Sequence, residues 1–415
     1  MKILVVGAGG REHALVWKLA QSAEVICAPG NAGIAQEVPC FAVNPMESDR
    51  VVALAKTENV DLVVVGPEDP LVNGLADALR AAGIATFGPG RDGAQIEASK
   101  AFSKELMAAA SVPTPEFRVF TEAEPAKAYA RQRFADGFPV VVKASGNALG
   151  KGVVVCDTEF EAEDAIRRML VDRVFGDAGR EIIIEDRLNG FEFSILSIVG
   201  DHNFVSLPIA RDHKRIGDGN VGPNTGGMGA FSPVASVPAE MVKDAEDRLV
   251  APILAALRER GIPFRGTLFS GIMTHNGQPF CLEYNARFGD PETQPLMMRL
   301  GAGFPEALYA AATGEVVPEI EVLDRAAVGV VVASAGYPGE VVKGIPMEIA
   351  PAPEGSKVFH AGTKMQLGRL TTNGGRVVCA VGTGQSVEEA RACAYRAADT
   401  VNFVGAYRRS DIAAE

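Results

Sequence analysis

The sequence lacks both an apolar run long enough to cross a membrane and a pair of cysteines at redox or metal-binding spacing. Nothing in it approaches the roughly 18 consecutive apolar residues of a membrane helix. Its six cysteines include no C-x-x-C pair and lie mostly in apolar runs, which favours reduced, buried thiols in a cytoplasmic protein. The first residues, MKILVVGAGG, predict a strand entering a glycine turn rather than a cleaved signal.

Positive charge is scarce as well. Lys and Arg total 40 against 52 Asp and Glu, and the net charge of -12 argues against a general nucleic-acid binder. Any phosphate ligand must therefore be met by basic residues gathered locally. With 415 residues, 47% of them hydrophobic and 22% charged, the chain fits roughly two to four soluble domains.

Residues 1–100 alternate strand and helix patterns. The strands read KILVVG, EVICAP, DLVVVG and IATFG, with helices expected over His13–Gln21 and Leu71–Ala82. This alternation predicts a doubly wound parallel sheet, in which ligands bind beyond the carboxyl ends of the strands. Two loops leave those ends, Gly7–His13 and Gly66–Asp69.

The first loop has Glu12 where a dinucleotide-binding G-x-G-x-x-G turn needs its third glycine. It suits a single phosphate at a helix N-terminus, or it is only a tight strand-to-helix turn. In the second loop, Glu68 either binds sugar hydroxyls or an amine, or caps the next element. The phosphate-binding candidates of the first loop are Gly9, Gly10, Arg11 and His13.

Pro113 and Pro115 mark a boundary between a helix expected over Ser99–Ala110 and a region of strands, about 117–193. In that region a strand, FPVVVKA, is followed by a glycine-rich loop, SGNALGKG, and by a second strand, VVVCD. The loop has one residue fewer than a P-loop and lacks the Ser or Thr hydroxyl at the end of that motif. We therefore predict a mobile hairpin flap that closes over phosphates. Lys143 either meets an anion there or snorkels from a sheet edge. The flap candidates are Gly146, Gly150, Lys151 and Gly152.

Further along, an Asn189-Gly190 pair between two strands predicts a hairpin. A long polar loop follows, ARDHKRIGDGNVGPNTGGMGAFSP, whose length and composition indicate function rather than simple disorder. After it we expect an amphipathic helix over 239–260 kinked at Pro252, a hairpin turning at Asn276-Gly277, and a helix over 296–314.

The richest stretch is Phe280–Gln294, FCLEYNARFGDPETQ. Strand alternation places Glu283, Asn285 and Arg287 on one face. The two oxygen ligands suit Mg²⁺ or Mn²⁺ holding phosphate oxygens, and the guanidinium offers a fork for a carboxylate or phosphate. The alternative is a sheet-edge strand with a solvated polar face.

The last part of the chain, from about residue 326, offers short strands and one helix over Ser386–Thr400. This pattern predicts a small α+β domain. Its polar candidates, His360, Lys364 and Arg376, are expected to be structural or peripheral.

These blocks, taken in order, resemble the glycinamide ribonucleotide synthetase (phosphoribosylamine–glycine ligase) family of the ATP-grasp superfamily over almost the full length. The most specific blocks are GPNTGGMG at 222–229 and RFGDPETQ at 287–294, supported by GAGGREHA at 7–14, GPE at 66–68 and DHKR at 212–215. The resemblance implies an α/β and α+β multidomain fold. Its expected parts are a phosphoribosylamine-binding domain (1–100), a central ATP-grasp domain (101–325) whose flap subdomain spans about 117–193, and a C-terminal domain (326–415).

The resemblance also implies the reaction: ATP drives the joining of phosphoribosylamine to glycine through glycyl phosphate, in de novo purine biosynthesis. ATP and Mg²⁺ or Mn²⁺ are the implied cofactors. The expected partners are small molecules only, with no nucleic acid and no membrane, and the chain is expected to be a monomer.

Site residues follow from the family motifs position by position. Asp212 would hold the glycine ammonium and Arg287 its carboxylate, with Lys214 beside them. The implied metal ligands are Glu283 and Asn285, and the implied ATP contacts are Lys100, Lys143, Glu185, Leu188, Glu192 and the flap residues. The implied contacts of phosphoribosylamine and of the other substrate atoms are Gly9, Gly10, Arg11, His13, Gly66, Pro67, Glu68, Asn224, Thr225, Gly226 and Asp290.

Some positions depart from the family pattern. Ser145, Asn147 and Leu149 change the flap, and Asp186 and Phe191 change the segment after it. These departures permit an alternative, a nucleotide-binding protein without turnover. A second alternative is another ATP-grasp carboxylate–amine ligase, against which the GPNTGGMG block discriminates.

Overall fold

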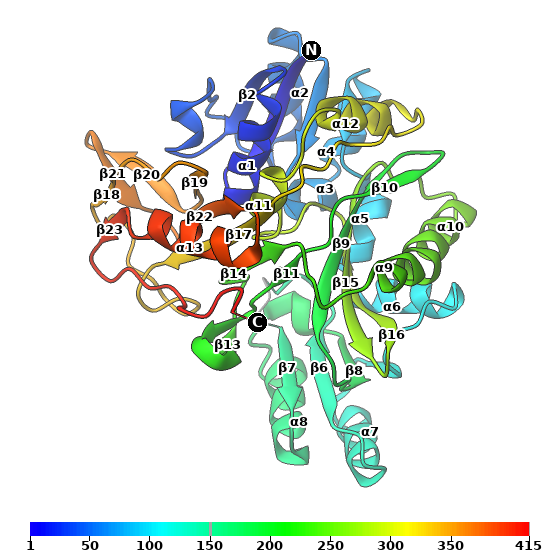
Figure 1. The fold of residues 1–415 in the computed structure, drawn as a ribbon. Helices are drawn as coiled ribbons and strands as arrows, with labels where there is room; N and C mark the ends of the chain where they lie inside the picture. Colours follow the sequence, from blue (N-terminus) through cyan, green and yellow to red (C-terminus); the bar gives the residue numbers. More distant parts are fainter. Residues whose placement is uncertain (149–151, 415) are drawn as a thin grey trace.

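A computed structural model describes residues 1–148 and 152–414 (Figure 1). The N-terminal region is a parallel sheet of order β2-β1-β3-β4, as the alternation predicted. Its strands are β1 (Lys2–Gly7), β2 (Glu24–Pro29), β3 (Leu62–Val65) and β4 (Ala85–Phe87). The helices around it are α1 (Gly10–Leu19), α2 (Ser48–Thr57), α3 (Glu68–Val72), α4 (Leu75–Ala81) and α5 (Arg91–Ala98).

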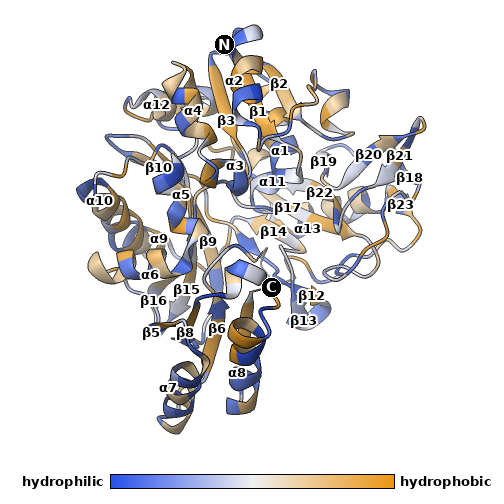
Figure 2. Ribbon diagram, turned by 180° about the vertical axis from the view of Figure 1, so that it is seen from behind, coloured by the Kyte–Doolittle hydropathy of each residue, from blue (hydrophilic) through white to orange (hydrophobic). Residues whose placement is uncertain are grey.

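Strands β1 and β3 are hydrophobic along their length (Figure 2), as parallel strands covered on both faces must be. The helix expected over Leu71–Ala82 is broken into α3 and α4. The break occurs because Gly74 adopts a left-handed conformation, φ 88°, which a helix interior does not accept.

The flap region forms a sheet of order β5-β8-β6-β7 and projects at the end of the molecule opposite the N-terminal sheet (Figure 1). It has a hydrophobic cluster of its own, separate from the cluster that runs through the rest of the chain. Gly150 and Lys151 of the predicted flap lie outside the described residues. The elements are β5 (Phe117–Phe120), α7 (Ala123–Ala135), β6 (Val140–Ala144), β7 (Val153–Cys156), α8 (Glu159–Ile166) and β8 (Ile182–Asp186).

The second sheet of the central region has the order β10-β9-β15-β16. Its β15–β16 hairpin turns at Asn276 and Gly277, both with positive φ, as predicted. Helix α6 packs nearby, and its predicted start is capped by Ser99. The elements are α6 (Lys100–Ala109), β9 (Glu192–Val199), β10 (Phe204–Ser206), α9 (Ala239–Ala245), α10 (Ala251–Glu259), β15 (Gly266–His275) and β16 (Gln278–Asn285).

The hairpin predicted at Asn189-Gly190 is wrong. Strand β8 pairs with β5 and β6, whereas β9 pairs with β10 and β15, so the segment between them crosses from one sheet to the other. Gly190 is needed here because the backbone of another strand passes close to it, and not because the chain turns. An added Cβ would lie 1.6 Å from the Thr274 carbonyl oxygen.

The helix expected over 239–260 is interrupted as Pro252 requires, because proline cannot donate to the preceding turn and crowds its carbonyls. A π-helical turn over Glu246–Val250 joins α9 to α10. The helix expected over 296–314 is likewise two helices, α11 (Thr293–Met297) and α12 (Phe304–Thr313), and Gly303 with φ 89° precedes the second.

The C-terminal sheet has the order β11-β14-β17-β22-β19 and is covered by α13 (Val387–Ala398). Its first two strands, β11 (Arg211–Asp212) and β14 (Gly229–Ser232), come from the polar loop of the central region. That loop is therefore ordered beside the C-terminal strands. The other elements are β12 (Arg215–Gly217), β13 (Val221–Asn224), β17 (Ala326–Ala333), β18 (Met347–Ile349), β19 (Ser356–His360), β20 (Thr363–Gln366), β21 (Arg369–Thr372), β22 (Arg376–Gly384) and β23 (Val401–Phe403).

Among the described helices, none combines the length and the apolar character that a membrane crossing requires.

Candidate active site

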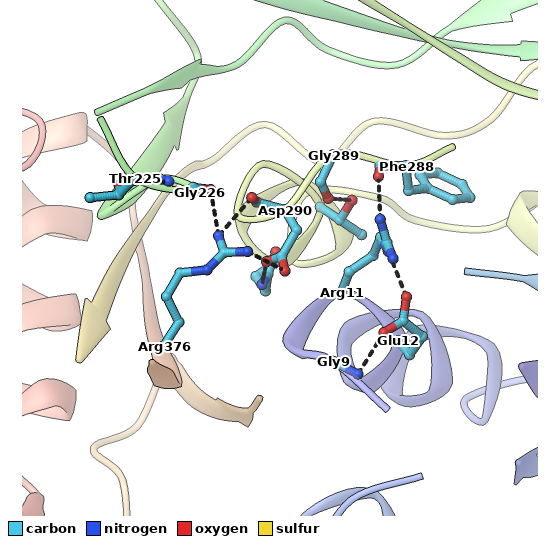
Figure 3. Close-up of polar contacts among 12 residues, drawn as sticks. Gly9, Arg11, Glu12, Thr225, Gly226, Phe288, Gly289, Asp290 and Arg376 are labelled. Atoms are coloured by element: carbon cyan, nitrogen blue, oxygen red, sulfur yellow. Dashed lines mark hydrogen bonds and ion pairs between the residues drawn. The ribbon is translucent and has the colours of Figure 1, made fainter. Parts of the chain in front are cut away.

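The N-terminal glycine loop is organised by Glu12, which sequence reasoning treated only as a mismatch. Its carboxylate accepts the Gly9 N–H at 2.6 Å and pairs with the Arg11 Nε at 2.5 Å (Figure 3). A Cβ on Gly66 would lie 2.2 Å from a Glu12 carboxylate oxygen, so the loop after β3 also packs on this side chain. Glu12 thus joins the two predicted loops.

Arg11 reaches from this loop to the turn after β16. Its guanidinium donates to the Phe288 carbonyl oxygen at 3.1 Å (Figure 3). The Glu68 carboxylate lies 4.0 Å away. Gly10 packs closely on the same turn, since an added Cβ would lie 2.8 Å from the Gln294 amide nitrogen. The predicted phosphate loop and the RFGDPETQ block therefore meet.

His13 does not join this group. It is buried, its Nε2 lies 3.0 Å from the Glu37 carboxylate, and its Nδ1 accepts the His360 backbone N–H at 2.8 Å. Burial lowers its pKa, which favours the neutral ring that this bonding pattern needs. Glu37 occupies Nε2 and the backbone of β19 occupies Nδ1, so the imidazole has no nitrogen left for a phosphate in this arrangement.

Arg287 lies between two carboxylates. Its guanidinium pairs with Glu97 at 2.7 Å and with Glu68 at 3.4 Å, and Glu97 also accepts the Ala286 N–H at 2.8 Å. Burial alone would lower the pKa of Arg287, but Glu97 and Glu68 raise it above its ordinary value. A brace between Arg287 and Asp290 is not formed, because the Asp290 carboxylate pairs with Arg376 instead.

Strand β16 contains a bulge that breaks the expected alternation at Leu282, whereas the pairing from Glu283 to Asn285 stays regular. Glu283 pairs with Gly271 across the sheet, but the next partner, Ile272, faces Cys281. Glu283 and Asn285 are half-buried. Within residues 1–148 and 152–414, no hydrogen bond or ion pair engages either side chain. Burial lowers the pKa of the Lys100 amine, and Glu283 lies near enough to oppose that shift.

The donor set of this strand fits a hard cation. A free carboxylate and a free amide oxygen, with amines nearby for phosphate, are the groups that Mg²⁺ or Mn²⁺ uses in phosphoryl-transfer sites. In the part of the chain that the structure describes, no cluster of three or more His, Cys, Asp or Glu side chains could hold a metal unaided. The strand would therefore need phosphate or water oxygens to complete the coordination.

The buried amines form one network. Glu185 pairs with Lys143 and, at 2.7 Å, with Lys104, and all three side chains are nearly inaccessible. Burial would raise the pKa of Glu185, but the two lysines lower it below its ordinary value. Lys143 is thus held by an anion rather than snorkelling from an edge. Lys100 donates to the Gly146 carbonyl oxygen at 3.3 Å, at the start of the flap loop.

Sequence reasoning missed Lys104. Its signal was available, because it lies four residues after Lys100 and therefore on the same face of α6.

A second ion-pair cluster joins two expected sites. Lys214 pairs with Glu192, an expected ATP contact, and lies 3.5 Å from the Asp212 carboxylate. Burial raises the pKa of Asp212, although Lys214 opposes this. Leu188 lies in the crossing segment between β8 and β9. The expected glycine and nucleotide contacts therefore adjoin each other at Lys214.

The glycine-rich loop is tied to both of its neighbours. Thr225 donates through its backbone N–H and its hydroxyl to the Lys214 carbonyl oxygen, each at 2.8 Å. Asn224 ends β13 just before it. Arg376, expected to be structural or peripheral, lies at the site: it donates to the Gly226 carbonyl oxygen at 2.5 Å and pairs with the Asp290 carboxylate at 2.9 Å (Figure 3).

Comparison with known proteins assigns this arrangement to a family. Models of the phosphoribosylglycinamide synthetase N domain, ATP-grasp (A) domain and C domain match residues 1–97, 98–293 and 327–415. The chain belongs to the phosphoribosylglycinamide synthetase family. The predicted resemblance and the three-part architecture with an ATP-grasp centre are thereby confirmed.

Individual relatives agree over the full length. The chain is 46% identical to the phosphoribosylamine–glycine ligase of Vibrio parahaemolyticus and 47% identical to that of Agrobacterium fabrum, over 99% of this chain and 97% and 98% of the relatives. The crystal structure of phosphoribosylamine–glycine ligase from Thermotoga maritima superposes with a TM-score of 0.86 at 34% identity, covering 99% of this chain and all of the other. A biotin carboxylase domain from Hydrogenobacter thermophilus shares the fold, with a TM-score of 0.73 at 19% identity.

Proposed function

We propose that the protein is an ATP-dependent ligase that joins 5-phosphoribosylamine and glycine to give glycinamide ribonucleotide, ADP and phosphate, in de novo purine biosynthesis. The observation that carries this proposal is the meeting of three segments at the turn after β16. Arg11 of the phosphoribosylamine loop, Gly226 of the glycine-rich loop and the Glu283 strand all adjoin residues 287–291. Three substrates that must react together need such a meeting point.

In this proposal ATP lies between the flap sheet and the Glu283 strand. Lys100 and Lys143 would bind its phosphates with the segment from Gly146 to Gly152, and Glu185, Leu188 and Glu192 would adjoin the adenosine. Glu283 and Asn285 would hold Mg²⁺ or Mn²⁺, which supplies charge neutralisation on the phosphates when bound. The Lys100 contact with Gly146 supports the amine's place beside the flap.

Glycine would be bound at both ends by Asp212 and Arg287, with Lys214 between the glycine and nucleotide sites. The glycine carboxylate would replace Glu68 on the Arg287 guanidinium, since that contact, at 3.4 Å, is longer than the 2.7 Å contact with Glu97. One carboxylate oxygen then attacks the γ-phosphorus, forming glycyl phosphate and releasing ADP. The positioned, paired charges supply the orientation that phosphoryl transfer requires.

The second substrate would approach from the N-terminal region, residues 1–100. Gly9, Gly10 and Arg11 would bind its phosphate, and the 66–68 loop and Asp290 its sugar. Its amine attacks the carbonyl carbon of glycyl phosphate, the C–O bond to phosphate breaks, and the amine loses a proton. We further propose that the protein acts as a cytoplasmic monomer on small molecules, without nucleic acid or membrane.

The test is a two-substrate dependence. Purified protein with ATP and Mg²⁺ is assayed for ADP release and, by mass spectrometry, for glycinamide ribonucleotide. We expect equal amounts of both products, and only when glycine and phosphoribosylamine are present together. ADP release that does not depend on both glycine and phosphoribosylamine would favour another ligase. Nucleotide binding without any ADP release would favour a binding protein.

A further inference from the structure

The Gly226 peptide is held on both sides by side chains of the C-terminal region. Its N–H donates to the Tyr337 hydroxyl at 2.9 Å. Its carbonyl oxygen accepts from the Arg376 guanidinium at 2.5 Å (Figure 3). A Cβ on Gly226 would lie 2.9 Å from the guanidinium carbon, closer than real Cβ contacts come. The backbone of Gly226 is therefore packed against the guanidinium and is fixed at both its N–H and its carbonyl oxygen.

The same guanidinium also fixes the turn that follows β16. It donates to the Asp290 carbonyl oxygen at 2.7 Å and pairs with the Asp290 carboxylate, which accepts a further bond from Gln294 at 2.6 Å. Beside it, a Cβ on Gly227 would lie 2.4 Å from the Pro291 ring. The loop and the turn are thus joined at two successive residues on each side.

The glycine-rich loop has its other anchor at the expected amino-acid site. Thr225 is bound twice to the Lys214 carbonyl oxygen, two residues from Asp212. The peptide of Gly226 therefore lies between that site and the C-terminal region, and its position is set from the C-terminal side. Tyr337 and Arg376 act from one place, because the tyrosine ring packs on Gly375, where an added Cβ would lie 2.3 Å from the ring.

We propose that Arg376 and Tyr337 are positioning residues for amino-acid specificity: they hold the Gly226 peptide as the wall that excludes a side chain on the amino-acid substrate. This inference rests on the proposed function. Glycine offers no side chain to grip, so discrimination must come from a wall that a larger amino acid strikes. A wall made of backbone excludes a methyl group only if the backbone cannot move. A loop held at one end only would shift and admit the methyl group.

The test compares glycine with L-alanine. Values of kcat/KM are measured for both amino acids, with phosphoribosylamine and ATP saturating, in wild type, Tyr337→Phe and Arg376→Lys. Rejecting one methyl group by shape is worth about 10- to 200-fold, so we expect the glycine-to-alanine ratio to fall by at least ~10-fold in each variant. Tyr337→Phe removes only a hydroxyl, so it decides the question even if the arginine variant fails to fold.

Two matched controls come from the same region. The Arg391 guanidinium also binds backbone carbonyls, of Ile412 and Ser410, and the Tyr395 hydroxyl also accepts a backbone N–H, of Ile412. Arg391→Lys and Tyr395→Phe should leave the ratio unchanged. An unchanged ratio in Tyr337→Phe, with glycine and alanine use falling together, would overturn the inference, as would an equal fall of the ratio in the controls. A wild-type protein without glycine-dependent turnover would overturn the proposed function itself.

Discussion

Replacing Glu185 by glutamine tests the buried charge network beneath the proposed ATP site. The change keeps the shape of the side chain but leaves Lys104 and Lys143 without a carboxylate, although both are almost completely inaccessible. At an effective dielectric constant of about 20, unit charges separated by 2.7 Å attract by roughly 6 kcal/mol before desolvation. Removing one partner of a buried pair typically costs about 3–5 kcal/mol, and we expect a loss of that size.

The matched control is Glu163→Gln in the same subdomain. Glu163 pairs with Arg131 at 2.5 Å, but the two side chains are 29% and 50% exposed, so the loss should be about 0–1 kcal/mol. The single tryptophan, Trp17, lies in α1 and reports on the N-terminal region. Unfolding of the flap sheet is therefore followed in urea by hydrogen exchange of the β6 and β8 amides.

The sign of the pH dependence is a second readout of the same variant. The two lysines hold the folded-state pKa of Glu185 below its ordinary value, so the unfolded chain binds its proton first as the pH falls. The contribution of Glu185 is fully present above the unfolded pKa of about 4.3 and is lost as the pH falls through the folded pKa. Glu185→Gln should lose this acid-dependent part. A loss no larger than that of Glu163→Gln, at any pH, would refute the reasoning.

Three further predictions concern the site itself. Arg287→Lys keeps the charge but loses the bidentate fork, so the apparent KM for glycine should rise much more than that for ATP; an equal rise of both, or a loss of thermal stability alone, would make Arg287 a brace. Glu283→Ala should abolish ligation by removing several kcal/mol of charge stabilisation while thermal unfolding stays close to wild type, and near-normal turnover at ordinary Mg²⁺ would rule the ligand role out. Burial, with Asp212 nearby, raises the pKa of Glu292 to about 8, so the folded state keeps a proton that the unfolded chain releases near pH 4.3, and stability falls as the pH rises between about 4.3 and about 8. Glu292→Gln should flatten that decline in denaturation curves measured across this range, and an unchanged slope would count against the burial effect.

Local patterns of the sequence predicted those parts of the fold that local physics decides. The apolar strands of residues 1–100, the Ser99 cap and the Asn276-Gly277 turn all depend on neighbours in the chain, and all are present. The Asn189-Gly190 hairpin failed because the same turn signal is produced by a glycine that a close backbone contact requires. Nothing within that segment shows that its two strands enter different sheets.

Predicting the candidate site succeeded for motifs and failed for contacts between distant segments. Arg376 and Asp290 are 86 residues apart, and His13 and His360 are 347 apart, so no spacing rule could bring them together. The bulge in β16 depends on its pairing with β15 rather than on its own alternation. Glu12 could have been suspected, because a glutamate at the third helical position commonly caps a helix N-terminus.

The most direct test of the proposed reaction follows an oxygen atom. The protein is given ATP, phosphoribosylamine and glycine labelled with ¹⁸O in both carboxylate positions, and the released phosphate is analysed by mass spectrometry. If the carboxylate attacks the γ-phosphorus and phosphate then leaves from the acyl carbon, each phosphate carries one ¹⁸O and the amide product retains the other. Phosphate without label, released in step with glycinamide ribonucleotide, would contradict the glycyl phosphate route.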